Sequence, residues 1–111
     1  MTSNIMILDS DSSNLNLIQQ VLRAEGFHVE TADNRPQQSV ILKWMNRLDL
    51  IIIDEKVPGF SEIYRELGNF PRVIFSLHSG SEYLKQGIEH FMIKPYGIKE
   101  LVAKIRTFLR K

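Results

Sequence analysis

Three short stretches of uninterrupted apolar residues, each closed by a polar side chain, constrain the fold of this chain more than any other feature. They are residues 5–8, 50–53 and 73–75, which end in Asp9, Asp54 and Ser76. Apolar runs of this length without alternation are typical of strands buried on both faces of a sheet. The segments between them carry apolar residues three and four positions apart, which predicts amphipathic helices.

The remaining segments complete an alternation of strands and helices. Residues 27–32 alternate between apolar and polar, and residues 91–93 form a last apolar run before Lys94 and Pro95. We expect one helix after each strand, the first capped by Ser12 or Ser13 and ended by Gly26, and the others near residues 34–48, 61–67, 81–86 and 98–109. Five strands alternating with five helices predict an α/β fold with a parallel sheet covered on both faces.

Composition excludes several classes of function. The chain of 111 residues is long enough for a single domain, and its 14 basic and 13 acidic residues give a net charge of +1. Because the positive and negative charges are so nearly balanced, we expect this domain to bind neither nucleic acid nor membrane. Without cysteine, the chain has no disulfide and no thiolate chemistry. No signal peptide or apolar stretch of about 20 residues is visible, so we expect a soluble, cytoplasmic protein.

Four polar residues that follow or end predicted strands form the candidate site. They are Asp9, Asp54, Ser76 and Lys94. A single aspartate after a strand more often serves a turn. Parallel strands, however, bring their carboxyl ends to one edge of the sheet, where ligands of such folds bind. Two carboxylates there could hold a divalent cation, and a hydroxyl and an ammonium could donate to phosphoryl oxygens.

Five motifs in the right order resemble the receiver domains of response regulators, the phosphorelay proteins of two-component signalling. They are residues 7–11, residues 49–54 with Pro58 and Gly59 behind them, residues 73–76, Gly87, and residues 91–96. The resemblance covers essentially the whole chain. It implies a single receiver domain at residues 1–111, with a flavodoxin-like, doubly wound sheet of five parallel strands in the order 2-1-3-4-5.

The resemblance assigns the chemistry of the site. Asp54 would be the phosphoacceptor, a nucleophile toward the phosphohistidine of a sensor histidine kinase or phosphotransfer protein, or toward a small phosphodonor. Asp9, Asp54 and the backbone carbonyl of Lys56 would hold Mg²⁺. Such a domain is a phosphoprotein switch and not an enzyme.

The resemblance also assigns the readout of the switch. Ser76 and Lys94 would bind the phosphoryl group, with Ser76 swinging toward it, and Phe91 occupies the position of the switch aromatic. The last two helices often form a partner face in this family, which points to a homodimer. A solvated charged surface is the plainer interpretation of the same residues.

Several positions depart from the family pattern. Ser10 replaces the second acid of the metal-binding pair, and the next acid, Asp11, is expected to point elsewhere. Lys56 either neutralises Asp54 in place of a metal or points to solvent. Leu77 is expected to narrow access to Asp54, and the segment between Asp54 and the switch serine is short. Mg²⁺ is therefore predicted to bind weakly or not at all.

Two functions remain open after these departures. One is a phosphoacceptor signalling switch with a weakened Mg²⁺ and phosphorylation site. The other is a phosphorylation-independent pseudo-receiver that acts as a protein–protein interaction module. A flavin-binding flavodoxin is disfavoured, because no Ser/Thr/Gly-rich phosphate loop follows the first strand. His28, His78 and His90 have no metal-ligand spacing and are not expected to act as ligands.

Overall fold

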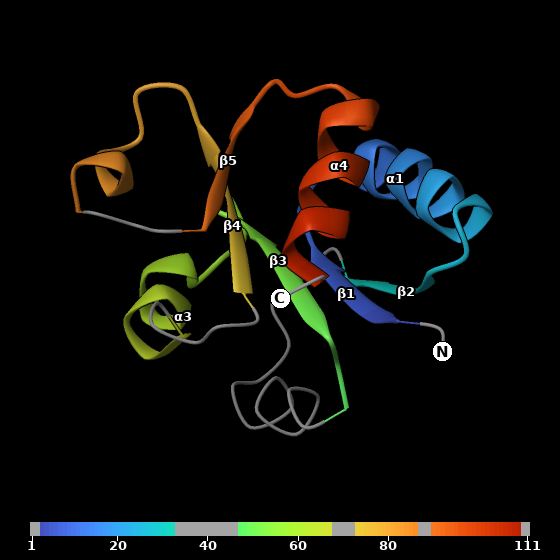
Figure 1. Cartoon of the computed structure of the whole chain (residues 1–111). Helices are drawn as coiled ribbons and strands as arrows, with labels where there is room; N and C mark the ends of the chain where they lie inside the picture. The colour runs from blue at the N-terminus through green and yellow to red at the C-terminus, as the bar shows by residue number, and fades with distance from the viewer. Residues whose placement is uncertain (1–2, 33–46, 68–72, 87–89, 110–111) are drawn as a thin grey trace.

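The computed structural model describes residues 3–32, 47–67, 73–86 and 90–109. Its strands are β1 (Asn4–Leu8), β2 (His28–Ala32), β3 (Leu50–Asp54), β4 (Val73–His78) and β5 (Phe91–Lys94). Its helices are α1 (Ser12–Ala24), α3 (Phe60–Leu67), the 3₁₀ helix η1 (Glu82–Gln86) and α4 (Ile98–Leu109), as Figure 1 shows. Most of the helix predicted near residues 34–48 lies outside the described residues.

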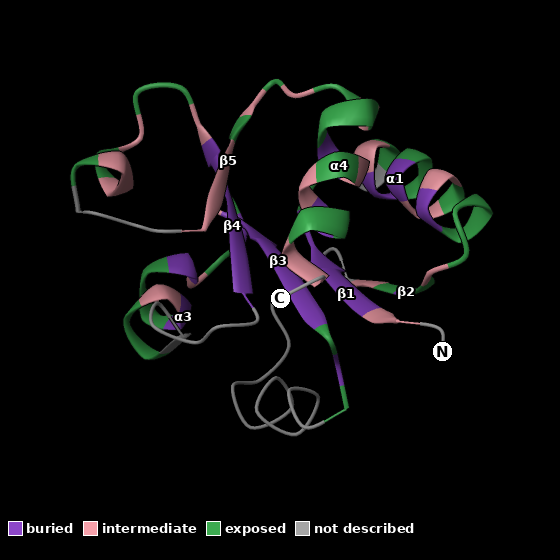
Figure 2. Ribbon diagram, in the orientation of Figure 1, coloured by how far each residue is buried: buried purple, intermediate pink, exposed green. Residues whose placement is uncertain are grey.

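The described strands form one parallel sheet in the order β2-β1-β3-β4-β5, which confirms the predicted topology. Helices α1 and α4 lie side by side on one face of this sheet, and α3 lies on the other (Figure 1). Each face carries its own apolar cluster. The buried residues concentrate on β1, β3 and β4, the inner strands (Figure 2). A sheet covered in this way explains the unbroken apolar runs of the sequence.

The start of α1 differs from the prediction. The N-cap is Asp11, whose side chain accepts a hydrogen bond from the backbone N–H of Asn14 at 3.1 Å, and the helix begins at Ser12. Aspartate and serine are equally good N-caps, so residue type alone did not decide between them. The helix ends at Ala24, and Gly26 follows with a φ of 96°, a conformation that favours glycine.

The region after the third apolar run also differs from the prediction. β4 continues through Ser76 to His78, so the serine lies within the strand and not at its end. The helix predicted at residues 81–86 is wrong in type, since η1 is a 3₁₀ helix of five residues. A segment this short has too few apolar side chains to stabilise an α-helix by packing one face against the core.

Candidate functional site

The carboxyl end of the sheet brings together the four side chains expected there. Asp9 follows β1, Asp54 ends β3, Ser76 lies in β4 and Lys94 ends β5. The two carboxylates and the serine are almost fully buried, with relative exposures of 3%, 1% and 2% respectively. Two buried carboxylates require compensating charge and hydrogen bonds, because burial removes their hydration. The surroundings of this pair therefore decide what the site can do.

Lys94 joins the two carboxylates. Its ammonium lies 2.7 Å from Oδ2 of Asp9 and 3.0 Å from Oδ1 of Asp54, within the distance expected for this ion pair. Burial alone would lower the pKa of Lys94, but hydrogen bonds and charge interactions with both carboxylates raise it above its usual value. Lys94 therefore stays charged at neutral pH and offsets one of the two negative charges.

Further protein donors contact the same two carboxylates. The backbone N–H of Asp11 donates to Oδ1 of Asp9 at 3.0 Å, and the side-chain amide of Asn14 donates to Oδ2 at 3.1 Å. The backbone N–H of Lys56 donates to Oδ2 of Asp54 at 2.9 Å. Hydrogen bonds to the ionised form stabilise a buried carboxylate. The acidic pair is thus held by the polypeptide itself.

His78 is a site residue that the sequence interpretation did not find. Its imidazole Nε2 lies 3.1 Å from Oδ1 of Asp54 and donates to it in the tautomer that carries the proton on Nε2. The signal was present in the strand pattern, since side chains two apart in a strand point to the same side. His78 follows Ser76 by two positions, so a serine directed at the site implied that the histidine would be directed there too.

Ser76 has an aromatic partner that the sequence interpretation did not identify. Its hydroxyl lies 3.4 Å from the phenol oxygen of Tyr96, in the loop before α4. Burial is the main reason that the pKa of Tyr96 is raised above its usual value. Phe91 instead pairs in register with Phe75 and packs against the apolar cluster on the α3 face. The predicted switch role of Phe91 stays a prediction.

A hollow of about 350 Å³ opens beside the carboxylates. Its walls combine the acid at the start of α1 with groups from β4, β5 and the loop after β5: Asp11, Asn14, His78, Lys94, Pro95 and Tyr96. Donors therefore dominate its lining. Such a hollow suits a small anionic group that lies against the ammonium and the imidazole.

The residues that depart from the family pattern do not all have the effects predicted for them. Ser10 is exposed, and Asp11 is committed to capping α1, so neither adds a buried carboxylate to the pair. The side chain of Lys56 is exposed, and its contact with Asp54 is made by the backbone. The expected obstruction by Leu77 is wrong, because this side chain is fully buried in the cluster on the α3 face. Strand alternation directs it away from the hollow.

A divalent cation would meet the oxygen ligands that Mg²⁺ prefers, since Asp9 and Asp54 both end at this edge. The fit is incomplete. Lys94 already lies between the two carboxylates, and among the described residues no group of three or more acidic or histidine side chains is placed to hold a metal. A cation would have to displace protein donors or share oxygens with them.

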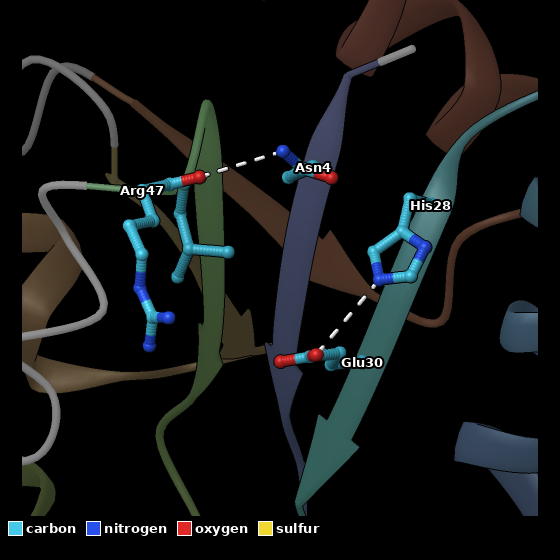
Figure 3. Close-up of a pocket in the computed structure, with 5 residues that line it drawn as sticks. Asn4, His28, Glu30 and Arg47 are labelled. Carbon is cyan, nitrogen blue, oxygen red and sulfur yellow. Dashed lines mark hydrogen bonds and ion pairs between the residues drawn. The ribbon is translucent and has the colours of Figure 1, made fainter.

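A second hollow lies at the opposite end of the sheet (Figure 3). It measures about 220 Å³ and is lined by residues of β1 and β2 and of the segment before β3: Asn4, His28, Glu30, Arg47 and Leu48. The amide of Asn4 donates to the carbonyl of Arg47, and His28 lies 3.8 Å from Glu30. The hollow lies toward the amino ends of these strands, whereas Asp54 is the last residue of β3, so it is separate from the site at Asp54.

Comparison with known proteins agrees with this geometry. Residues 5–106 match the response regulator receiver domain, and the chain belongs to this family. It is 28% identical over its whole length to the DNA-binding response regulator MtrA of Mycolicibacterium paratuberculosis and 30% identical over 98% of its length to the transcriptional regulatory protein CpxR of Escherichia coli. The chain spans about half of each relative, 53% and 50%.

Solved structures share the fold. A putative response regulator from Chloroflexus aurantiacus superposes with a TM-score of 0.77 at 20% identity, with all of both chains covered. An orphan response regulator of H. pylori gives 0.73 at 22% identity, with 97% of each chain covered. Within the described residues, no helix is long and apolar enough to cross a bilayer.

Proposed function

We propose that this receiver domain is a signalling switch whose phosphoacceptor is Asp54 and whose Mg²⁺ site is weakened. The observation that carries the proposal is the ion pair between Lys94 and the buried carboxylates of Asp9 and Asp54. A buried carboxylate beside an ammonium, at the edge of a donor-lined hollow, is a suitable acceptor for an anionic group.

The transfer step follows from this arrangement. An oxygen of the Asp54 carboxylate attacks phosphorus, a new P–O bond forms, and the bond from phosphorus to the donor's leaving group breaks with its electron pair. The nucleophile is the carboxylate form of Asp54, so no proton leaves it in this step. Lys94, whose ammonium lies 3.0 Å from Oδ1 of Asp54, neutralises charge on the transferred group. Bound Mg²⁺ would neutralise further charge on that group, held by Asp9, Asp54 and the backbone carbonyl of Lys56.

Two features support a weakened metal site. Ser10 removes one carboxylate from the position where related receivers carry an acid, and hard cations prefer anionic oxygen. The oxygens that remain already accept hydrogen bonds from Asn14, Lys94 and the backbone of Lys56. Replacing these donors costs binding energy, so the apparent affinity for Mg²⁺ falls.

The second candidate function is a pseudo-receiver that works without phosphate. The same donors favour it, because they stabilise the acidic pair with no cation at all. In that case the fold would present a fixed surface to a protein partner. Asp54, Ser76 and Lys94 favour the switch, since a pure interaction module needs none of them.

Labelling with acetyl phosphate separates the two candidates. The 111-residue chain is incubated with acetyl phosphate and Mg²⁺, and intact mass reports one added phosphoryl group. Slow labelling of the wild type, absent in Asp54→Asn, supports the switch. No labelling at any Mg²⁺ concentration, with a folded protein by circular dichroism, contradicts it and favours the pseudo-receiver.

The wider setting of the switch is part of the same proposal. We expect a sensor histidine kinase or a phosphotransfer protein as the donor, in the cytoplasm, and a homodimer through the last two helices. The relatives named above are DNA-binding or transcriptional regulators about twice as long as this chain. We expect any contact with DNA to be made outside this domain, which carries a net charge of only +1.

A further inference from the structure

We propose that His78 and Glu55 form an accessory phosphoryl-binding arm at Asp54. In this arm His78 contacts the transferred group, and Glu55 is the positioning residue that holds His78 in place. The inference deepens the proposed function and rests on it, because Asp54 must first accept a phosphoryl group.

The first observation is the direction of the His78 ring. Its Nε2 lies 3.1 Å from Oδ1 of Asp54, the same oxygen that Lys94 contacts at 3.0 Å. Its side chain is 35% exposed to solvent and lines the hollow beside the site. A group bound to Asp54 from this hollow would therefore meet the ring. The N–H that donates to the free carboxylate would then donate to a phosphoryl oxygen.

The second observation is how the loop after β4 is fixed. One carboxylate oxygen of Glu55 accepts a hydrogen bond from the backbone N–H of His78, and the other accepts one from the hydroxyl of Ser81 at 2.9 Å. The backbone N–H of Glu55 donates to the carbonyl of Ser76 at 2.9 Å. Glu55 thus ties the end of β3 to the end of β4 and to the turn before η1. A turn fixed at both sides holds the imidazole over the carboxylate.

The third observation is the excess of negative charge at the site, which an additional donor would help to stabilise. Asp9 and Asp54 carry two negative charges, and Lys94 alone bridges them among the ion pairs of the described residues. A phosphoryl group adds more negative charge to the site. Ser10 supplies no carboxylate there that would help to hold a neutralising cation. An additional N–H donor aimed at Asp54 supplies part of the missing stabilisation.

Four variants test the arm. His78→Leu removes the donor, and His78→Gln keeps a side-chain N–H of similar reach. Glu55→Leu removes both acceptors, whereas Glu55→Gln can accept from the backbone N–H of His78 and donate to the Ser81 hydroxyl. The initial rate of Asp54 labelling by acetyl phosphate is measured by intact mass. We expect His78→Leu to be about tenfold slower than wild type, the effect of one lost charge-assisted hydrogen bond.

The matched variants isolate positioning from folding. Glu55→Leu should approach the slow rate of His78→Leu, and Glu55→Gln should restore most of the wild-type rate. Adding His78→Leu to Glu55→Leu should slow labelling little further, because both changes remove the same contact. A ¹H–¹⁵N spectrum of the unphosphorylated protein should show the Nε2–H proton of His78 protected from exchange with water by its hydrogen bond to Asp54, in wild type and Glu55→Gln. That signature should be lost in Glu55→Leu.

Contrary outcomes are distinguishable from failure of the proposed function. Labelling of His78→Leu at the wild-type rate overturns the accessory arm and leaves Asp54 as phosphoacceptor. Additive losses in the double variant, with the ring signature intact in Glu55→Leu, overturn the role of Glu55. A wild type that is never labelled overturns the proposed function and the phosphoryl contact of His78 with it.

Discussion

The hydroxyl of Ser76 lies 3.4 Å from the phenol of Tyr96, which links the inner strand β4 to the loop before α4. Both groups are polar atoms in a mostly buried setting, so removing one leaves the other without this partner. Tyr96→Phe and Ser76→Ala should each lower the free energy of unfolding by about 0.5–1 kcal/mol, because the contact is long and neutral. Urea denaturation measures both effects. If the double variant loses the full sum of the two, the residues are not coupled in solution.

Lys94 should contribute more to stability than any single carboxylate of the site. Lys94→Met leaves Asp9 and Asp54 buried with uncompensated charge, which should cost about 3 kcal/mol at neutral pH. Asp54→Asn keeps the pair of Lys94 with Asp9 and should cost less. Urea denaturation at pH 7 compares the variants. Equal stability of Lys94→Met and wild type would show that the carboxylates are neutral or well hydrated.

Leu77 should behave as a core residue and not as a gate over Asp54. Its side chain is 0% exposed, so Leu77→Ala should lower the free energy of unfolding by about 3 kcal/mol. Leu17, 49% exposed on α1, provides the control, and Leu17→Ala should change stability little. Labelling of Leu77→Ala with acetyl phosphate, corrected for the folded fraction, should match wild type. Faster labelling of Leu77→Ala would show that Leu77 does narrow access to Asp54, as the sequence predicted.

Stability should fall at alkaline pH. The pKa values of Tyr96 and Lys94 are raised in the folded protein above their ordinary values of 10.0 and 10.5. The folded state therefore keeps these protons longer than the unfolded chain, and their contribution is full below pH 10 and lost as the pH rises through the folded values. Urea denaturation from pH 8 to 11 should show this decline. Tyr96→Phe should have a shallower one.

Sequence alone predicted the fold because apolar runs and helical spacing alternate consistently along the chain. The apolar runs of β1, β3 and β4 are covered on both faces, as is typical of the inner strands of a parallel sheet. The placement of Asp9, Asp54 and Lys94 followed from the parallel order of the strands. Such reasoning locates the end of a strand, however, and not which side each residue faces.

The errors concerning Leu77 and His78 have one physical source. Leu77 was assigned by its position next to Ser76, although alternation along β4 directs it to the opposite face of the sheet. The same alternation was needed to find His78, two residues beyond the serine. Tyr96 lies in a loop, where no periodicity predicts the direction of a side chain. Its contact with Ser76 required the three-dimensional structure.

The dependence of Asp54 labelling on Mg²⁺ tests the account most directly. Labelling rates with acetyl phosphate are measured over a range of Mg²⁺ concentrations for wild type and for Ser10→Asp, with Asp54→Asn as the unlabelled control. We predict that Ser10→Asp lowers the Mg²⁺ concentration for half-maximal rate by about tenfold, about 1.4 kcal/mol of binding free energy. Saturation of both proteins at the same Mg²⁺ concentration would contradict a weakened metal site.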